Sequence, residues 1–368
     1  MSYNWQQPDW PHFRYDLAPI QDALFAIATT MGHMSGLLKG LPEAMQTETV
    51  LGLMVSEAVK TSAIEGEILS RADVMSSIRN QLALNVPLES VRDARATGAA
   101  ELMMDVRRTF AEPLSQARLF TWHHLLLKSR SEQMRVGAWR IHPEPMQVVS
   151  GPIGKTKVHF EAPPSKRVPK EMNTFIQWFN STGPGGTQEI KLAAVRAAIT
   201  HLFFESIHPF DDGNGRIGRA LSEKALSQGV GYPVLLSLSK TIEANKKKYY
   251  AALKEAQHAN EITPWITYFV HIVLEAQIDA EKQIDFVLKK TKFFDRNASK
   301  LDERQIKVIR RMLEEGPQGF AGGMNAKKYI GITSVSKATA TRDLQFLQDL
   351  GILQRVGAGR STRYVLVF

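Results

Sequence analysis

The chain has 368 residues, 43% of them hydrophobic and 23% charged, which is enough for two or three domains with buried cores. It has no cysteine, so disulfides and thiolate metal sites are excluded and a reducing, cytoplasmic setting is expected. No apolar run approaches the ~20 residues of a membrane span, and residues 1–8 lack the basic and apolar regions of a secretory signal. We therefore expect no association with membranes.

The first region, residues 1–112, is predicted to be mainly helical. Apolar residues recur at helical spacing from Leu51 to Ile64, and the segment ends in Thr61-Ser-Ala-Ile-Glu65-Gly66. By itself, a glutamate before a glycine indicates only a solvated charge at a helix end.

The second region, residues 113–290, is predicted to be a helical core interrupted by a β-hairpin. Two β-prone runs, 146–149 and 157–160, are separated by a segment with the glycines and proline of a turn. The hairpin residues of interest are Val148, Val149, Ser150 and Gly151. Without further context they belong to an ordinary surface hairpin.

The most informative stretch is His208-Pro-Phe-Asp-Asp-Gly-Asn-Gly-Arg-Ile-Gly-Arg219. The residues before it, 192–207, have the apolar spacing of a largely buried helix. Pro209 ends this helix, because proline has no N–H and clashes with the preceding turn. His208 therefore lies at a helix exit, where its imidazole can face a cleft and accept a proton.

The loop that follows has the residues of a phosphate site. Gly213 and Gly215 tolerate positive φ and let backbone N–H groups converge on an anion, and the helix that follows directs its N-terminal dipole to the same place. Arg216 and Arg219, three residues apart on that helix, can each donate to phosphate oxygens. Asp212 is a hard oxygen ligand suited to the Mg²⁺ that accompanies a polyphosphate.

Residues 301–368 are predicted to form a winged helix-turn-helix, reached through a polar linker at 295–300. We expect helices at 304–314, 325–329 and 336–350, a turn at 331–333 and a β-hairpin wing over 351–366. Eleven Lys and Arg against six Asp and Glu give this region a net charge of +5. A basic helix and wing favour DNA contact, although such domains also serve as protein-docking modules.

The stretch 208–219 resembles the signature of the Fic family of protein adenylyltransferases, His-x-Phe-x-Asp/Glu-Gly-Asn-Gly-Arg-x-x-Arg. Every specified position is met, by His208, Phe210, Asp212, Gly213, Asn214, Gly215, Arg216 and Arg219. The resemblance implies a mainly helical Fic core, plausibly a homodimer, that moves AMP from ATP to a Ser, Thr or Tyr hydroxyl of a protein and releases pyrophosphate. It also implies a role for each motif residue: His208 deprotonates the hydroxyl, Asp212 binds Mg²⁺, Asn214 and the glycine loop hold the α- and β-phosphates, and Arg216 and Arg219 hold the outer phosphates.

The resemblance also gives the helix end at 61–66 a role. Many Fic proteins carry an inhibitory helix with the pattern Ser/Thr-x-x-x-Glu-Gly/Asn, which Thr61, Glu65 and Gly66 fit. By analogy, Glu65 pairs with Arg219 and repels the outer phosphates of ATP, so that bound nucleotide is misplaced for transfer.

Two further segments gain functions from the same resemblance. The hairpin corresponds to a flap that binds the target protein by strand pairing. Tyr249, Tyr250 and Gln257, on a helix predicted over 246–257, correspond to the lining of the adenine and ribose pocket. Gln257 departs from the asparagine that the family often has, and packing in the core is the alternative for the two tyrosines.

Two classes of function remain open from the sequence. The first is an autoinhibited, Mg²⁺-dependent protein adenylyltransferase, and the second is a DNA-binding regulator whose nucleotide site only senses ATP. His208 favours the enzyme, since a sensor has no need of a base. Within the enzyme class, a bifunctional protein that also removes AMP, with Glu65 positioning water, is a further alternative.

Overall fold

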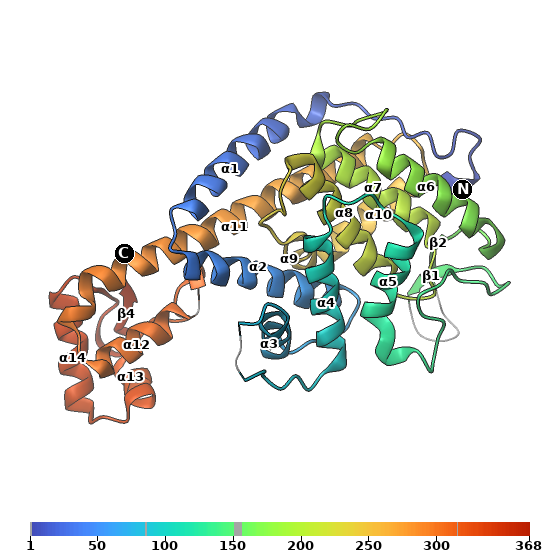
Figure 1. Cartoon of the computed structure of the whole chain (residues 1–368). Helices are drawn as coiled ribbons and strands as arrows, with labels where there is room; N and C mark the ends of the chain where they lie inside the picture. The colour runs from blue at the N-terminus through green and yellow to red at the C-terminus, as the bar shows by residue number, and fades with distance from the viewer. Residues whose placement is uncertain (1, 85–86, 151–156, 315) are drawn as a thin grey trace. The chain divides into compact units, whose positions relative to one another are not determined.

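The structure is a computed structural model that describes residues 2–84, 87–150, 157–314 and 316–368 (Figure 1). It is mainly helical, which confirms the predicted fold class. None of the helices in these ranges is long and apolar enough to cross a membrane. The helices are α1 (Gln21–Lys39), α2 (Glu43–Ile64), α3 (Arg71–Gln81), α4 (Ala94–Arg108), α5 (Gln116–Leu127), α6 (Val168–Ser181), α7 (Ala193–Ile207), α8 (Asn214–Val230), α9 (Leu238–Ala244), α10 (Lys246–Ala256), α11 (Thr263–Asn297), α12 (Glu303–Leu313), α13 (Ala326–Thr333) and α14 (Lys337–Asp349).

Both predicted hairpins are present. β1 (Gln147–Ser150) pairs antiparallel with β2 (Lys157–Glu161), with an irregularity between Val148 and Val149. β3 (Leu353–Val356) pairs antiparallel with β4 (Arg363–Leu366) in regular register.

The chain divides into two compact units. The first comprises Met1–His33 and Val50–Ala280, and the second comprises Met34–Thr49 and Glu281–Phe368. α1, α2 and α11 each continue from one unit into the other. The polar stretch 295–300, expected to be a linker, is instead helical, because α11 runs through Asn297 and a 3₁₀ turn, Ala298–Lys300, follows directly.

The first unit is built around α7 and α8, which pack on each other along their lengths (Figure 1). Every residue of α7 from Ala194 to Ile207 is buried, so this helix is enclosed on all sides. It also contacts α6, while α8 contacts α4 and α5. Trp265 of α11 closes the core from another direction, donating from its indole N–H to the Ala198 carbonyl at 2.8 Å. This packing holds the turn between α7 and α8 in place.

In the second unit, α12, α13, α14 and the β3–β4 hairpin pack with the end of α11 around one apolar core. α12 begins with a capping box in which Asp302 and Gln305 satisfy each other's backbone N–H groups. The predicted turn at 331–333 is wrong, because these residues are the last three of α13. The helix ends at Thr333, and the next residue, Ser334, has a φ of 59° and donates its N–H to the Ile330 carbonyl. The core is formed by Phe293, Val308, Ile309, Met312, Leu313, Met324, Tyr329, Ala340, Leu344, Leu347, Ile352, Leu353 and Tyr364.

A polar group of three residues lies inside this core. The buried carboxylate of Asp343 accepts a hydrogen bond from the Tyr329 hydroxyl (2.8 Å) and another from Nε of Arg304 (2.8 Å). Burial alone would raise the pKa of Asp343, but these two hydrogen bonds and the charge of Arg304 lower it below its ordinary value. The carboxylate is therefore ionised in the folded unit and connects α12, α13 and α14.

We expect Asp343→Asn to lower the unfolding free energy of the second unit by about 1–3 kcal/mol at neutral pH. Because the folded-state pKa is lowered, the carboxylate stabilises the unit above the ordinary Asp range and loses that effect as the pH falls through the folded-state value. The difference between variant and wild type should therefore shrink as the pH falls below the ordinary Asp range. All six tryptophans lie in the first unit, so hydrogen exchange of α14 peptides is the suitable measurement. Asp349→Asn, an exposed site on the same helix, is the control, and a difference independent of pH would contradict this account.

Candidate active site

His208 lies at the exit of α7. Its φ and ψ are 51° and 62°, in the left-handed region, which is uncommon for a residue with a side chain. Pro209 follows, and Arg140 holds the turn by donating from Nε to the His208 carbonyl (2.8 Å) and from its backbone N–H to the Pro209 carbonyl (3.0 Å). The orientation of the histidine is thus imposed by the surrounding packing.

Arg140 also joins this turn to the base of the β1–β2 hairpin. Its guanidinium donates to the Pro163 carbonyl (2.5 Å) and to the Ser165 hydroxyl (3.0 Å). Burial lowers the pKa of Arg140 to about 10, although the charge of Asp211 raises it, so the group stays charged at cellular pH. One buried cation therefore connects the histidine turn with the hairpin.

The loop after His208 is closed by Phe210 and Asn214. Asn214 accepts from the Phe210 N–H through Oδ1 (2.9 Å) and donates to the Phe210 carbonyl through Nδ2 (2.8 Å). The Phe210 ring is buried and stacks on His123, with 4.0 Å between ring centroids. Both polar atoms of Asn214, which the sequence assigned to phosphate, are engaged inside the loop.

His123 supports the loop from α5 as a neutral imidazole. Its Nδ1 accepts from the Gly137 N–H (2.8 Å), so the proton is on Nε2, which donates to the Asp212 carbonyl (3.2 Å). Burial lowers the pKa of His123 to about 4, although Asp212 raises it. The ring is therefore uncharged at cellular pH and serves to position Asp212.

The two loop glycines are required for different reasons. Gly213 has a φ of 81° and precedes α8, as expected of a left-handed turn. Gly215 has no positive φ and lies in the first turn of α8. A Cβ at Gly215 would lie 2.3 Å from Oε1 of Glu65, so the missing side chain makes room for this carboxylate.

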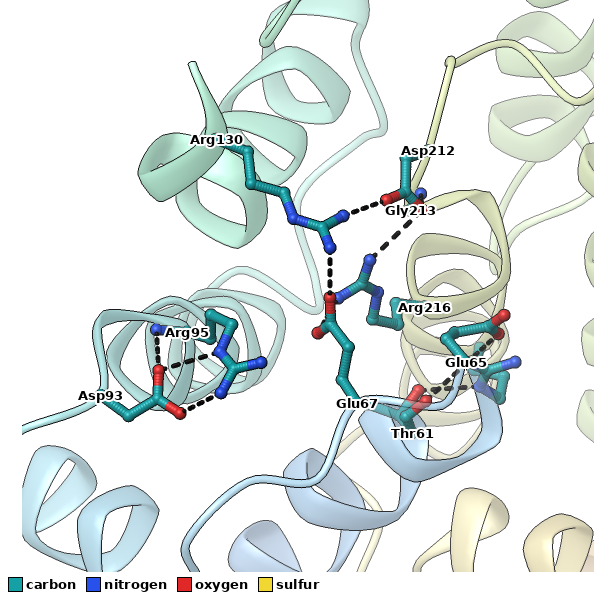
Figure 2. A network of polar contacts seen from close by, with 10 residues as sticks. Thr61, Glu65, Glu67, Asp93, Arg95, Arg130, Asp212, Gly213 and Arg216 are labelled. Carbon is teal, nitrogen blue, oxygen red and sulfur yellow. Dashed lines mark hydrogen bonds and ion pairs between the residues drawn. The ribbon is translucent and has the colours of Figure 1, made fainter. Parts of the chain in front are cut away.

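Glu65 and Thr61 bind Arg219 directly, and Figure 2 shows both beside the start of α8. Oε1 of Glu65 lies 2.7 Å from an Nη of Arg219, while the Thr61 hydroxyl and carbonyl accept from the same guanidinium at 2.8 and 3.0 Å. The Arg219 side chain is only 1% exposed. Burial alone would lower its pKa, but the charge of Glu65 raises it. The pairing of Glu65 with Arg219 expected from the sequence is present.

A second carboxylate, Glu67, binds the other motif arginine (Figure 2). Its Oε2 lies 2.6 Å from Nη1 of Arg216, whose side chain is 2% exposed. Glu67 also lies 3.4 Å from Arg130, which in turn pairs with the Asp212 carboxylate at 2.6 Å. Arg216 and Arg219 are thus both bound by carboxylates from the short 61–67 segment, and Asp212 pairs with Arg130.

Asp212 is the residue expected to bind a metal. Within the described ranges no three His, Asp or Glu side chains form a metal-binding group. Its carboxylate is 40% exposed, and Oδ1 accepts from the Gly213 N–H at 2.6 Å. Mg²⁺ in nucleotide sites commonly takes one carboxylate together with substrate phosphates and water. A single exposed carboxylate beside a helix N-terminus fits that donor set.

The three residues assigned to the adenine and ribose pocket differ in exposure. Tyr249 is 1% exposed and its hydroxyl lies 2.8 Å from Nε2 of His201, so it is a core residue. Gln257 is 5% exposed and donates to the Glu205 carbonyl at 3.3 Å. Tyr250 is 38% exposed and contacts the Ile64 carbonyl at 3.5 Å, at the end of α2. Of the three, only Tyr250 offers substantial surface to a ligand.

The hairpin residues assigned to target binding also differ in exposure. Val148 packs partly into the small cluster around Trp5 and Phe160, whereas Val149 is 48% exposed. Ser150 ends β1, and Gly151 lies outside the described residues. Among the residues described, no third strand pairs with either edge of this hairpin.

The sequence analysis missed four residues that shape the site: Glu67, His123, Arg130 and Glu205. Glu67 had a visible signal, since it stands two residues after Glu65 and directly beyond Gly66. Glu205 had one too, since it stands three residues before His208. His123 and Arg130 carry none, because only the folded chain brings α5 and the segment after it beside the motif loop. Glu205 faces His208 from the last turn of α7.

Comparison with known proteins identifies the domain that carries this geometry. Residues 113–226 match the family model described as Fic/DOC family. The core of the first unit is therefore similar to the Fic/DOC family over these residues. Residues 3–84, which include the 61–67 segment, match a model described as a domain of unknown function, DUF4172.

Relatives named protein adenylyltransferases match only part of the chain. A probable protein adenylyltransferase from Aquifex aeolicus is 34% identical over 99 residues, which is 27% of this chain and 27% of that protein. The protein adenylyltransferase Fic of Nematostella vectensis is 31% identical over 140 residues, 38% of this chain and 30% of that protein. This chain therefore spans less than a third of either relative.

The fold extends further than the sequence similarity. A crystal structure of a Fic family protein from Desulfovibrio desulfuricans G20 aligns with a TM-score of 0.52 and 19% identity, over 95% of this chain and 97% of that one. Fic-1 of C. elegans aligns with a TM-score of 0.52 and 20% identity, over 73% of this chain and 72% of that one. At these identities the likeness establishes the fold.

We expect Asn214→Ala to destabilise the first unit by about 2–4 kcal/mol, because it leaves a buried N–H and a buried carbonyl of Phe210 without partners. Asn214→Asp keeps the acceptor but places a buried negative charge against the Phe210 carbonyl, so it should cost at least as much. Tryptophan fluorescence during chemical denaturation reports the first unit and measures both. The exposed Asn245→Ala serves as control, and equal stability of Asn214→Ala and this control would refute the assignment.

Proposed function

We propose that this protein is an autoinhibited protein adenylyltransferase, which transfers AMP from ATP to a Ser, Thr or Tyr hydroxyl of a protein. The observation that carries the proposal is the placement of His208 beside the N-terminus of α8, with Arg216 and Arg219 on that helix and Glu65 bound to Arg219. The Fic/DOC match and relatives named protein adenylyltransferases support it.

The chemistry follows from these positions. The acceptor O–H gives its proton to Nε2 of His208, and its oxygen forms a bond to the α-phosphorus of ATP. The bond from that phosphorus to the bridging oxygen breaks, and pyrophosphate leaves. The backbone N–H groups at the start of α8 stabilise the phosphate charge, since the side chain of Asn214 is already engaged. Mg²⁺ held by Asp212 would neutralise charge on the phosphates.

Autoinhibition follows from charge and space at Arg219. A phosphate oxygen has the same charge and prefers the same donor as the Glu65 carboxylate, so the two compete for one buried guanidinium. Glu65 also lies against Gly215, inside the first turn of α8, where the phosphate N–H groups are. ATP that binds with Glu65 in place therefore meets negative charge where its outer phosphates belong.

Glu67 extends this restraint to Arg216. The Glu67–Arg216 pair is as short as the Glu65–Arg219 pair and nearly as enclosed. Arg130 bridges Glu67 to Asp212 and so competes with Mg²⁺ for the same carboxylate. The resting site thus has protein carboxylates in place of phosphates and an arginine in place of the metal.

Replacing Glu65 by glycine should release the restraint and raise transfer by at least about tenfold, because Arg219 becomes available to phosphate. The measurement uses α-phosphate-labelled ATP with the purified protein and cell lysate, and reads label on protein. His208→Ala in the Glu65→Gly background should abolish the label. If Glu65→Gly labels no faster than the wild type, autoinhibition by Glu65 is wrong.

Replacing Glu67 by glutamine should tighten ATP binding about 3- to 10-fold, since an amide of the same shape competes less with phosphate for Arg216. Calorimetric titration with ATP and Mg²⁺ measures this in an otherwise wild-type chain. Glu132→Gln makes the same change of net charge at an exposed position and should leave the affinity unaltered. Equal affinities for the two variants would show that Glu67 exerts no restraint.

A nucleotide-sensing DNA-binding regulator is the second candidate. It is favoured by the exposed face of α14, where Lys337, Thr341, Arg342 and Gln345 line a shallow groove, in a unit that carries excess positive charge. The labelling experiment distinguishes the two. Absence of label in every sample, with ATP still bound, would support the regulator.

A further inference from the structure

Glu205 is a buried carboxylate that the chemistry described above leaves without a task. It lies in the last turn of α7, three residues before His208, and its side chain is 6% exposed. Its Oε2 is 3.6 Å from Nδ1 of His208. Among the described residues, Nδ1 of His208 and Oε1 of Glu205 are both buried without a hydrogen-bond partner. The carboxylate thus lies close to an imidazole nitrogen that has no hydrogen-bond partner.

The fold makes room for this carboxylate. A Cβ at Gly218 on α8 would lie 2.6 Å from Oε1 of Glu205, so the missing side chain leaves room for this carboxylate. Burying a carboxylate costs free energy unless charges or hydrogen bonds compensate for it. Burial alone would raise the pKa of Glu205, but the charges of His208, His201 and Arg219 lower it. The side chain is therefore anionic beside the histidine.

We propose that Glu205 is the positioning residue of His208: it accepts the Nδ1 proton and so keeps Nε2 free to take the proton of the acceptor hydroxyl. This rests on the proposed transferase function. Glu205 lies in the last turn of α7, and the left-handed turn at His208 directly after the helix places the ring 3.6 Å from its carboxylate. When Nε2 accepts a proton, the anionic carboxylate stabilises the imidazolium, as in other carboxylate–histidine pairs.

Two substitutions separate orientation from charge. Glu205→Gln keeps an oxygen that accepts from Nδ1 but removes the negative charge. Glu205→Leu has similar volume and removes both. In the Glu65→Gly background we expect kcat to fall about tenfold with Gln and about 100- to 1000-fold with Leu. The dissociation constant for ATP should stay the same, and adding either substitution to His208→Ala should change nothing further.

A second readout needs no transfer activity. Imidazole ¹⁵N NMR of the intact protein, with the His208 signals identified by their loss in His208→Gln, shows which nitrogen carries the proton. We expect the proton on Nδ1 in wild type and in Glu205→Gln, and a shift toward Nε2 in Glu205→Leu. Thermal denaturation of each variant confirms that it is folded. If Glu205→Leu does not fold, the loss of kcat in Glu205→Gln still tests the role of the negative charge.

The outcomes separate this inference from the proposed function. Normal transfer and an unchanged tautomer in the Leu variant would overturn the role of Glu205 while leaving the transferase intact. Weaker ATP binding with unchanged kcat would also overturn it, because Glu205 would then act as a counter-charge for Arg219. If no variant transfers AMP, the proposed function fails, and the proton position on His208 still decides whether Glu205 orients the ring.

Discussion

The site depends on one short turn between α7 and α8, and the packing of these two helices in the core fixes the position of that turn. α7 is buried on all sides and α8 crosses it at close range, so the residues between them have a single path. Pro209 ends α7, Arg140 binds the carbonyls of the turn, and Asn214 closes the loop onto Phe210. The base and the phosphate-binding helix start are therefore fixed relative to each other before any ligand arrives, which removes an ordering cost from the reaction.

Charge pairing across this turn explains how the site rests without nucleotide. Buried arginines need anionic partners, and the 61–67 segment supplies carboxylates to both of them. In the proposed function, the same pairs occupy the donors that phosphate would take. Stability and restraint would then be two results of one set of contacts, released when the segment moves or exchanges its carboxylates for phosphates.

The predictions from sequence succeeded where the information was local. The apolar spacing of 192–207 and Pro209 located the end of α7, and both hairpins appeared from their alternating runs and turn residues. They failed where packing overrides local preference. α13 continues through Gly331, because the helix docks on the core of the second unit, and α11 continues through polar residues that read as a linker. For Tyr249 the sequence left core packing and a ligand contact open, and the fold buries it against His201.

By itself, the sequence determined the chemical inventory: a histidine, a glycine loop, an acid and two arginines at fixed offsets within twelve residues, because these lie on one continuous turn and helix. It also pointed to Glu65 through a resemblance. Only the tertiary structure decided what those groups meet. Glu67 reaches Arg216 from about 150 residues away, Arg130 reaches Asp212 from α5's end, and Gly215 and Gly218 leave space for Glu65 and Glu205. Contacts of this kind depend on how helices pack across each other, which the spacing of residues along the sequence does not determine.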